Sequence, residues 1–167
     1  MKALVIGASG FTGSYLANRL EEKGYDVYGF VRPTSNVDAL SPKVTLIRGD
    51  LTFRDSVFQA IEGMDCVYHI AATYRDSGVC EQTYYDVNVM GTRHVLDACL
   101  DATVGRMVHC STVGVHGHVE NPPATERSPF NPSDVYQSTK LEAERLVGQY
   151  IESGLAATIC RPVGMYG

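Results

Sequence analysis

The sequence predicts an α/β fold in which a parallel sheet is covered by helices on both faces. Short β-branched runs alternate with longer helical segments along the 167 residues, and strands that alternate with helices form right-handed βαβ units. The runs ALVI at 3–6 and CVYHIA at 66–71 are apolar almost throughout, as strands buried on both faces require. A composition of 44% hydrophobic and 20% charged residues suits one globular domain.

Six strands and four helices are expected. The strands are predicted at 3–6, 26–31, 44–48, 66–71, 106–110 and 157–160. The helices are predicted at 12–23, 54–62, 84–102 and 133–153. Gly24 follows the first helix as a C-cap, and Ser133 or Asp134 can cap the last. The proline-rich segment 117–132 is longer than most connections, and such loops at the carboxyl end of a parallel sheet often belong to a binding site.

A glycine-rich stretch, GASGFTG, lies at 7–13 between the first strand and the first helix. In a GxxGxxG pattern one glycine allows a tight turn, one lets the backbone approach a pyrophosphate, and one permits close packing of helix on strand. The helix N-terminus then offers free N–H groups to the anion. The stretch therefore predicts a Rossmann-type doubly wound sheet, with about six strands in the order 3-2-1-4-5-6. It predicts dinucleotide binding by Gly7, Ser9, Gly10, Phe11, Thr12 and Gly13.

The residue after the second strand bears on the choice of cofactor. About twenty residues beyond the glycines, NAD-binding domains usually carry an acid that holds the adenosine ribose 2′-hydroxyl. Here the strand runs into Arg32 instead. Because an arginine can accept a 2′-phosphate, the sequence favours NADP over NAD; the alternative is an exposed loop arginine.

The stretch YQSTK at 136–140 places a phenol and an ammonium four residues apart at the start of a predicted helix. Two such positions lie about 40° apart around the axis and about 6 Å apart along it. A polar pair at this spacing is also common on solvated helix faces, so Tyr136 and Lys140 alone do not indicate catalysis. The glycine loop strengthens the catalytic interpretation, because it predicts a nicotinamide beside this helix.

Composition argues against several classes of partner. A formal net charge of −5 disfavours nucleic acid and anionic membranes, and no run of about 18 apolar residues occurs. The apolar stretch near the N-terminus passes into glycines after a few residues, so it is read as a strand and not as a signal peptide. A cytoplasmic protein is expected.

Cysteines and histidines predict no metal site. The five cysteines are odd in number and form no CxxC pair, and Cys66, Cys110 and Cys160 fall inside strand-like runs. They are interpreted as small buried hydrophobes in a reducing compartment. His116 and His118 have no acidic or thiol partner at ligand spacing.

Seven motifs occur in a recognisable order. They are GASGFTG at 7–13, GDL at 49–51, HIAA at 69–72, NVMGT at 88–92, CSTVGVHG at 110–117, YQSTK at 136–140 and RPVGMYG at 161–167. In these motifs the chain resembles the extended short-chain dehydrogenase/reductase superfamily, NAD-dependent epimerase/dehydratase group, along essentially its whole length. The resemblance implies an NAD(P)-binding domain over residues 1–167, truncated before a last strand and a carboxyl-terminal substrate domain. It also implies a possible homodimer through the helices at 84–102 and 133–153.

The same resemblance assigns further cofactor-binding residues. Asp50 and Leu51 would border the adenine, and Ala71 and Ala72 would line the cofactor after the fourth strand. Pro162, in the last motif, is included in the predicted cofactor site.

The resemblance also assigns catalytic roles. Tyr136 would be the general acid/base, and Lys140 would hold the nicotinamide ribose hydroxyls and lower the phenol pKa. Thr112 would stand where the family has a catalytic serine or threonine, with Ser111 as the neighbouring alternative, and Asn88 would support the active site from a helix.

The function implied is interconversion of a secondary alcohol and a ketone by hydride transfer on a small molecule. A nucleotide-sugar epimerase or dehydratase is expected first. One alternative is an NADPH-dependent ketone reductase similar to dihydroflavonol reductases, which Arg32 favours. Another is a non-catalytic dinucleotide-binding module, against which the intact Tyr136 and Lys140 argue. His116 replaces the tyrosine common in the family's VYG, so substrate details are expected to differ.

Overall fold

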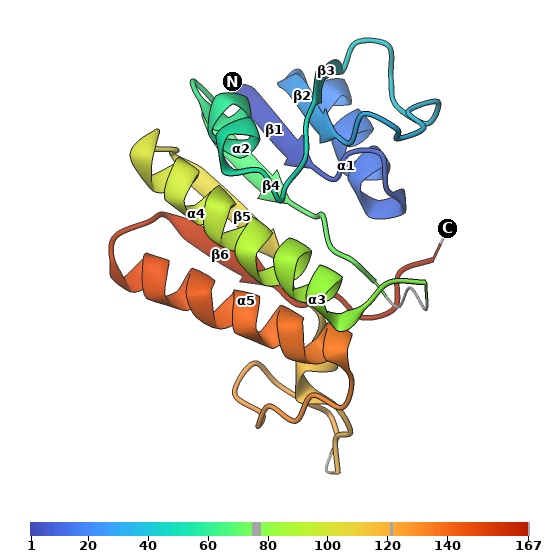
Figure 1. The fold of residues 1–167 in the computed structure, drawn as a ribbon, viewed down its shortest axis with the longest axis vertical. Helices are drawn as coiled ribbons and strands as arrows, with labels where there is room; N and C mark the ends of the chain where they lie inside the picture. Colours follow the sequence, from blue (N-terminus) through green and yellow to red (C-terminus); the bar gives the residue numbers. More distant parts are fainter. Residues whose placement is uncertain (75–77, 121, 167) are drawn as a thin grey trace.

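Six parallel strands form a single sheet in the order β3-β2-β1-β4-β5-β6 (Figure 1). The computed structural model describes residues 1–74, 78–120 and 122–166. The strands are β1 (Lys2–Ile6), β2 (Asp26–Val31), β3 (Thr45–Arg48), β4 (Cys66–His69), β5 (Arg106–Cys110) and β6 (Ala157–Cys160). The predicted strand order is confirmed. It reverses between β1 and β4, and ligands of such sheets bind in the crevice at the carboxyl ends of these strands.

The helices agree with the prediction except around residue 85 and at 113–116, where a short helix was not predicted. They are α1 (Phe11–Glu22), α2 (Arg54–Ile61), α3 (Glu81–Tyr84), η1 (Tyr85–Met90), α4 (Gly91–Asp101), η2 (Val113–His116) and α5 (Val135–Glu152). The single helix expected at 84–102 is instead a short α3, a π-helical stretch η1 and then α4. Asp134 caps α5, because its carboxylate accepts a hydrogen bond from the Gln137 amide at 2.7 Å.

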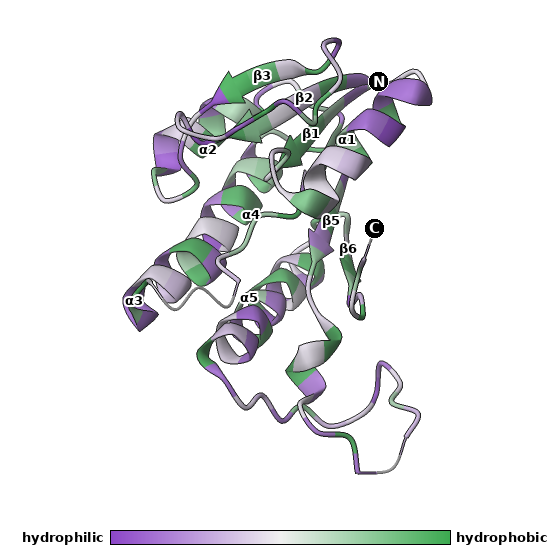
Figure 2. Cartoon of the chain, turned by 90° about the vertical axis from the view of Figure 1, so that its right-hand side faces the viewer, coloured by the Kyte–Doolittle hydropathy of each residue, from purple (hydrophilic) through white to green (hydrophobic). Residues whose placement is uncertain are grey.

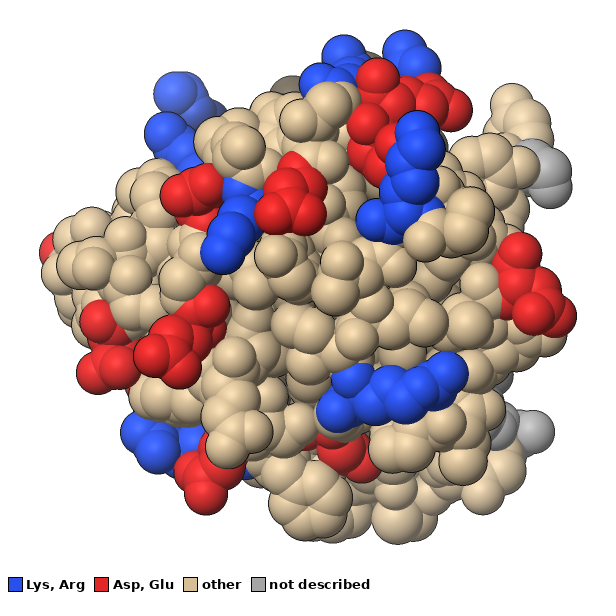
Figure 3. Space-filling model, turned by 90° about the horizontal axis from the view of Figure 1, so that it is seen from above, with Lys and Arg blue, Asp and Glu red and all other residues tan. Residues whose placement is uncertain are grey.

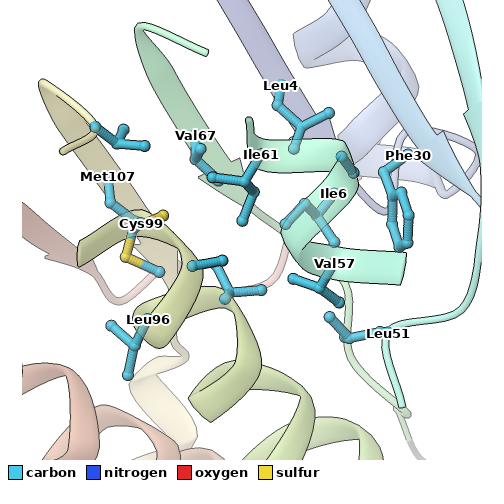
Figure 4. Close-up of a cluster of buried hydrophobic side chains, with 14 of the residues drawn as sticks. Leu4, Ile6, Phe30, Leu51, Val57, Ile61, Val67, Leu96, Cys99 and Met107 are labelled. Carbon is cyan, nitrogen blue, oxygen red and sulfur yellow. The ribbon is translucent and has the colours of Figure 1, made fainter. Parts of the chain in front are cut away.

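The core lies in two layers on either side of the sheet. Alternate residues of a strand point to opposite faces, so Leu4 and Ile6 of β1 pack toward Val57 and Ile61 of α2 (Figure 4). This larger cluster extends under α4 and α5. A smaller cluster on the opposite face packs α1 against β1 and β2 (Figure 2).

The cysteines lie in different environments. Cys66 and Cys99 are buried and Cys110 is half-buried, whereas Cys80 and Cys160 are exposed. The expectation of buried thiols is therefore wrong for Cys80 and Cys160. Cys80 precedes α3 at the surface, and Cys160 lies on the edge strand β6, on the face of the sheet opposite α5.

The described surface carries no dominant charge on the face that Figure 3 shows, where acidic and basic side chains are interspersed. Within residues 1–74, 78–120 and 122–166, none of the helices has the length and apolar character needed to cross a bilayer. The same residues contain no group of three or more metal-ligating side chains.

Candidate active site

A cavity of about 870 Å³ extends along the carboxyl ends of the strands. Its size lies within the range of small-molecule sites. Its wall contains nearly all of the predicted site residues: Gly7, Ser9, Gly10, Phe11, Thr12, Gly13, Arg32, Asp50, Leu51, Ala71, Ala72, Thr112, Tyr136 and Pro162. Asn88 and Lys140 lie behind the wall. Segments far apart in the sequence are thus gathered around one space.

The glycine loop is shaped by close approach of backbone to backbone. Gly7 has φ +89°, a conformation that favours glycine, and a Cβ there would lie 2.8 Å from the Ala71 nitrogen. A Cβ on Gly13 would lie 2.1 Å from the Gly7 oxygen. Gly10 precedes α1, so no side chain covers the first-turn N–H groups. This cradle fits the diphosphate of a dinucleotide.

The far end of the cavity is formed by the turn after β2 and by Asp50. Arg48 donates to the carbonyls of Arg32 at 3.4 Å and Pro33 at 2.9 Å, which fixes this turn. Both Arg32 and Ser35 line the cavity. Ser35 was not predicted; its position three residues after the arginine is the only signal the sequence offers.

Thr112 lies two residues after the end of β5 and has a hydroxyl suited to donate to a substrate. Its Oγ1 accepts a hydrogen bond from the Gly114 amide at 3.1 Å, which leaves its own proton to be donated. The Ser111 hydroxyl donates instead to Glu144 Oε2 at 2.6 Å. Since the Ser111 proton is engaged, the geometry favours Thr112 over Ser111.

Tyr136 lies in the first turn of α5 and contacts a second tyrosine. The rings of Tyr74 and Tyr136 meet edge to face, with centroids 4.9 Å apart. Tyr74 also lines the cavity and is 62% exposed. Tyr74 was not predicted as a site residue, although its place two residues after the HIAA motif, beyond the carboxyl end of β4, puts it at the same edge of the sheet.

Lys140 is buried one helical turn after Tyr136. Its Nζ donates to the Cys110 carbonyl at 2.6 Å, and the residue is 2% exposed. Burial lowers the pKa of Lys140 to about 8, although the Cys110 and Glu144 charges oppose the shift. The ammonium therefore stays mostly protonated at pH 7, next to the helix turn that carries the phenol.

Asn88 joins two walls of the cavity without lining it. Its amide nitrogen donates to Thr139 Oγ1 at 3.0 Å and to the Thr73 carbonyl at 3.2 Å, and its oxygen accepts from the Thr73 amide at 2.8 Å. Thr139 precedes Lys140 on α5. Asn88 is supplied by η1, and π-helical turns occur frequently at functional sites. Its hydrogen bonds hold Thr73 of the cavity wall against Thr139 of α5.

His116 does not line the cavity. It is 4% exposed, and its ring lies between the Pro129 carbonyl at 3.1 Å and an Arg161 nitrogen at 3.3 Å. His116, which stands where the family commonly has a tyrosine, therefore contacts the loop that contains Pro129 and not the cavity.

Comparison with known proteins gives consistent matches. The NAD dependent epimerase/dehydratase family matches residues 3–167. Sterol demethylase protein B of Methylococcus capsulatus is 36% identical over 171 residues, covering 100% of this chain and 52% of the relative. For the 3-beta-hydroxysteroid dehydrogenase of Mycolicibacterium neoaurum the identity is 36% over 176 residues, covering 99% and 48%.

A solved structure of a UDP-glucose 4-epimerase from Brucella ovis, in complex with NAD, matches with a TM-score of 0.88 and 28% identity. It covers 96% of this chain and 51% of that one. The chain thus spans about half the length of the relatives it matches. Because the family match extends over nearly every residue and the glycine loop has the geometry that a dinucleotide requires, this chain belongs to the NAD dependent epimerase/dehydratase family.

Proposed function

We propose that the chain is the cofactor-binding and catalytic portion of an enzyme that interconverts a secondary alcohol and a ketone. One observation carries the proposal: Thr112 and Tyr136 line the same cavity as the dinucleotide loop. A nucleotide-sugar epimerase or dehydratase is the first candidate for this activity. Two proteins that this chain matches over about half of their length are named as epimerases.

The loop at 7–13 would hold the dinucleotide, and its nicotinamide would supply the hydride chemistry when bound. Tyr136 gives a proton to, or takes it from, the substrate oxygen. A phenol with an ordinary pKa of about 10 needs about 4 kcal/mol of differential stabilisation to work near pH 7. The buried ammonium of Lys140, one turn away, favours the phenolate. Thr112 donates a hydrogen bond to the same oxygen and orients it.

A reductase that uses NADPH is the second candidate. Arg32 and Ser35 line the adenosine end of the cavity, where they can receive a 2′-phosphate. Among the described residues that line the cavity, Arg32 and Asp50 are the charged ones, and Tyr74, Val79 and Val113 are apolar or aromatic. Such a wall suits a ketone on an apolar skeleton, and one relative is named as a 3-beta-hydroxysteroid dehydrogenase.

Two measurements separate these candidates. A reductase consumes NADPH in step with the ketone, whereas an epimerase returns its cofactor unchanged. NADP preference predicts tighter binding of NADPH than NADH, and Arg32→Ala should weaken NADPH binding about tenfold while leaving NADH binding nearly unchanged. Equal affinities in the unsubstituted chain would refute the NADP assignment.

We also propose that residues beyond 167 complete the protein with a last strand and a substrate domain. The length of the relatives supports this, as do the exposed Thr158 and Cys160 on the edge strand β6. Exposed Leu100 on α4 and Ile151 on α5 are compatible with a homodimer through these helices. A cytoplasmic location stays a prediction.

The catalytic proposal is tested by Tyr136→Phe in the full-length protein. Turnover should fall at least about 100-fold, because a general acid/base is lost, while the Kd for the cofactor stays within about twofold. Tyr74→Phe is the matched control, since it removes a hydroxyl from the neighbouring ring, and it should retain most of the turnover. A Tyr136→Phe protein with unchanged turnover would show that another group is the acid, whereas an unsubstituted protein with no turnover would support the non-catalytic module.

A further inference from the structure

Four polar side chains form one hydrogen-bonded group behind the catalytic end of the cavity. Arg161 donates to Glu144 Oε1 at 2.5 Å through Nη2 and to Oε2 at 3.0 Å through Nε. Ser111 donates to the same carboxylate, and His116 accepts from Arg161. Ser111, His116 and Glu144 are 5% exposed or less, and the Arg161 side chain is 18% exposed. This group is called the Arg161 cluster below.

The Arg161 cluster joins the elements that carry the proposed reacting groups. Ser111 directly precedes Thr112, and Glu144 lies one helical turn after Lys140 on α5. Arg161 directly precedes Pro162, whose carbonyl accepts from the Val113 amide at 3.0 Å. Through Ser111, Glu144 and Arg161 the cluster therefore links the residue after β5, α5 and the segment after β6, which limits movement of Thr112 relative to α5.

His116 links the cluster to the 122–131 segment, and its partners define its protonation. A carbonyl such as that of Pro129 only accepts, so Nδ1 must carry a proton; a guanidinium only donates, so Nε2 must be bare. The ring is therefore neutral in this arrangement. Phe130 stacks on the His116 ring with centroids 5.4 Å apart, and the Arg161 guanidinium lies 5.0 Å from the Phe130 centroid.

A proton on His116 would break this arrangement. Nε2–H would then point at an Arg161 donor 3.3 Å away. The charged groups that face the ring are Arg161 and Glu144, and Glu126 contributes its carbonyl to Arg161 at 3.1 Å. Burial raises the pKa of Glu144, but hydrogen bonds from Arg161 and Ser111 outweigh it and hold this pKa below the ordinary value. Glu144 thus keeps its charge in weak acid.

We propose that Arg161 and His116 are positioning residues: the Arg161 cluster sets Thr112 relative to Tyr136, and it holds the 122–131 segment only while His116 is neutral. The inference rests on the roles proposed for Thr112 and Tyr136. By this proposal, the position of the Thr112 hydroxyl depends on the buried ion pair of Arg161 and Glu144, which lies outside the cavity wall.

Amide hydrogen exchange of the 167-residue chain tests this without any substrate. Three amides report on the cluster: Asn131 bonds to the Val115 carbonyl at 3.1 Å, Val113 to Pro162, and Gly114 to the Thr112 hydroxyl at 3.1 Å. Between pH 7.5 and 5.5, after correction for intrinsic rates, exchange at all three should rise by up to about tenfold, which is the limit for one imidazole that is protonated only in the opened state. The Ile70 amide, bonded to Ile6 at 3.0 Å in the sheet, reports global opening, so a step is assigned to the cluster only where the three amides exchange faster than Ile70 at both pH values.

Three variants sharpen the test. His116→Phe keeps the stack on Phe130 but has no nitrogen, so exchange should be fast at both pH values. His116→Gln offers Arg161 an acceptor that does not titrate, so exchange should be independent of pH. The exposed His118 supplies the control, and His118→Phe should behave like the unsubstituted chain.

The proposal is overturned if the unsubstituted chain shows no pH step at these amides, or if His116→Gln keeps it. A step at Asn131 with none at Val113 and Gly114 would mean that the cluster anchors a loop without positioning Thr112, and would also overturn it. These readouts do not depend on turnover, so a failure of the catalytic proposal in Tyr136→Phe is seen separately.

Discussion

The two ends of the cavity are built from different physics. At the dinucleotide end, the loop at 7–13 is held by main-chain contacts, and its glycines are needed because a Cβ has no room. At the catalytic end, three charged groups are partly or fully buried, namely Lys140, Glu144 and Arg161. Lys140 lies close to His69 and His109, which burial keeps neutral. Binding at one end thus depends on shape, whereas reactivity at the other depends on electrostatics in a medium of low dielectric. Substitutions at the two ends should therefore fail in different ways.

The largest effect is expected at the dinucleotide end. Gly13→Ala puts a Cβ 2.1 Å from the Gly7 oxygen, so backbone must move. It should lower the free energy of unfolding by about 2–3 kcal/mol and weaken NADPH binding by at least about 100-fold, as measured by denaturant melts and fluorescence titration.

Gly148→Ala is the matched control, because Gly148 lies inside α5 with open space around it. This change should stabilise the chain by about 0.5–1 kcal/mol and leave NADPH binding unchanged. If Gly13→Ala binds NADPH normally, the shape argument for this end is wrong.

The catalytic end should be sensitive to acid. His69 and His109 are fully buried with ring centroids 5.4 Å apart, and burial followed by the charge of Lys140 lowers both pKa values, that of His69 to about 3. The unfolded chain binds a proton at His69 below about pH 6.5 and the folded chain does not, so stability is lost as pH falls. By pH 5 the loss from His69 is about 2 kcal/mol.

His69→Leu should remove this part of the pH dependence, measured as the difference in unfolding free energy between pH 7 and 5. The exposed His118 provides the control, and His118→Leu should leave the acid loss unchanged. An identical loss in His69→Leu and the unsubstituted chain would contradict the assignment of a neutral buried ring.

Lys140 should act at the opposite end of the pH scale. Its pKa is about 8 in the folded chain, chiefly because of burial, and about 10.4 when unfolded, so the unfolded state binds more protons between these values. Stability should therefore rise by about 2 kcal/mol from pH 8 to 10. The rise should be absent in Lys140→Met, because methionine does not titrate, and a rise of the same size in both proteins would rule out Lys140 as its source.

The smallest stability effect concerns Thr112. Thr112→Val keeps the shape but removes the acceptor for the Gly114 amide, so about 1 kcal/mol should be lost in denaturant melts. Thr112→Ser retains a hydroxyl and should recover most of the stability and, in the full-length protein, most of the turnover. A Thr112→Val protein that turns over as fast as the Ser variant would remove Thr112 from the catalytic proposal.

The dinucleotide end of the cavity could be predicted from the sequence better than the catalytic end. The glycine loop and the strand order could be predicted, because turn chemistry and strand alternation are local patterns. The π-helical η1 could not, since the apolar spacing of residues 84–102 does not reveal a change in hydrogen-bond register.

The contacts at the catalytic end were also beyond prediction. Lys140 bonds to a carbonyl thirty positions away, and Glu144 bonds to Arg161 across seventeen. No sequence pattern reports such partners, because they depend on how α5 packs against β5 and β6. The chemical roles of Tyr136 and Thr112 stay predictions until turnover is measured.

The central claim is that Lys140 activates the phenol of Tyr136 beside the cofactor. It is tested most directly by carbon NMR of labelled tyrosine in the chain saturated with NADP⁺, following the ring signal of Tyr136 with pH and assigning it through Tyr136→Phe. We expect the phenol to titrate near pH 7, and its midpoint to return toward about 10 in Lys140→Met. A midpoint near 10 in both proteins would contradict the account.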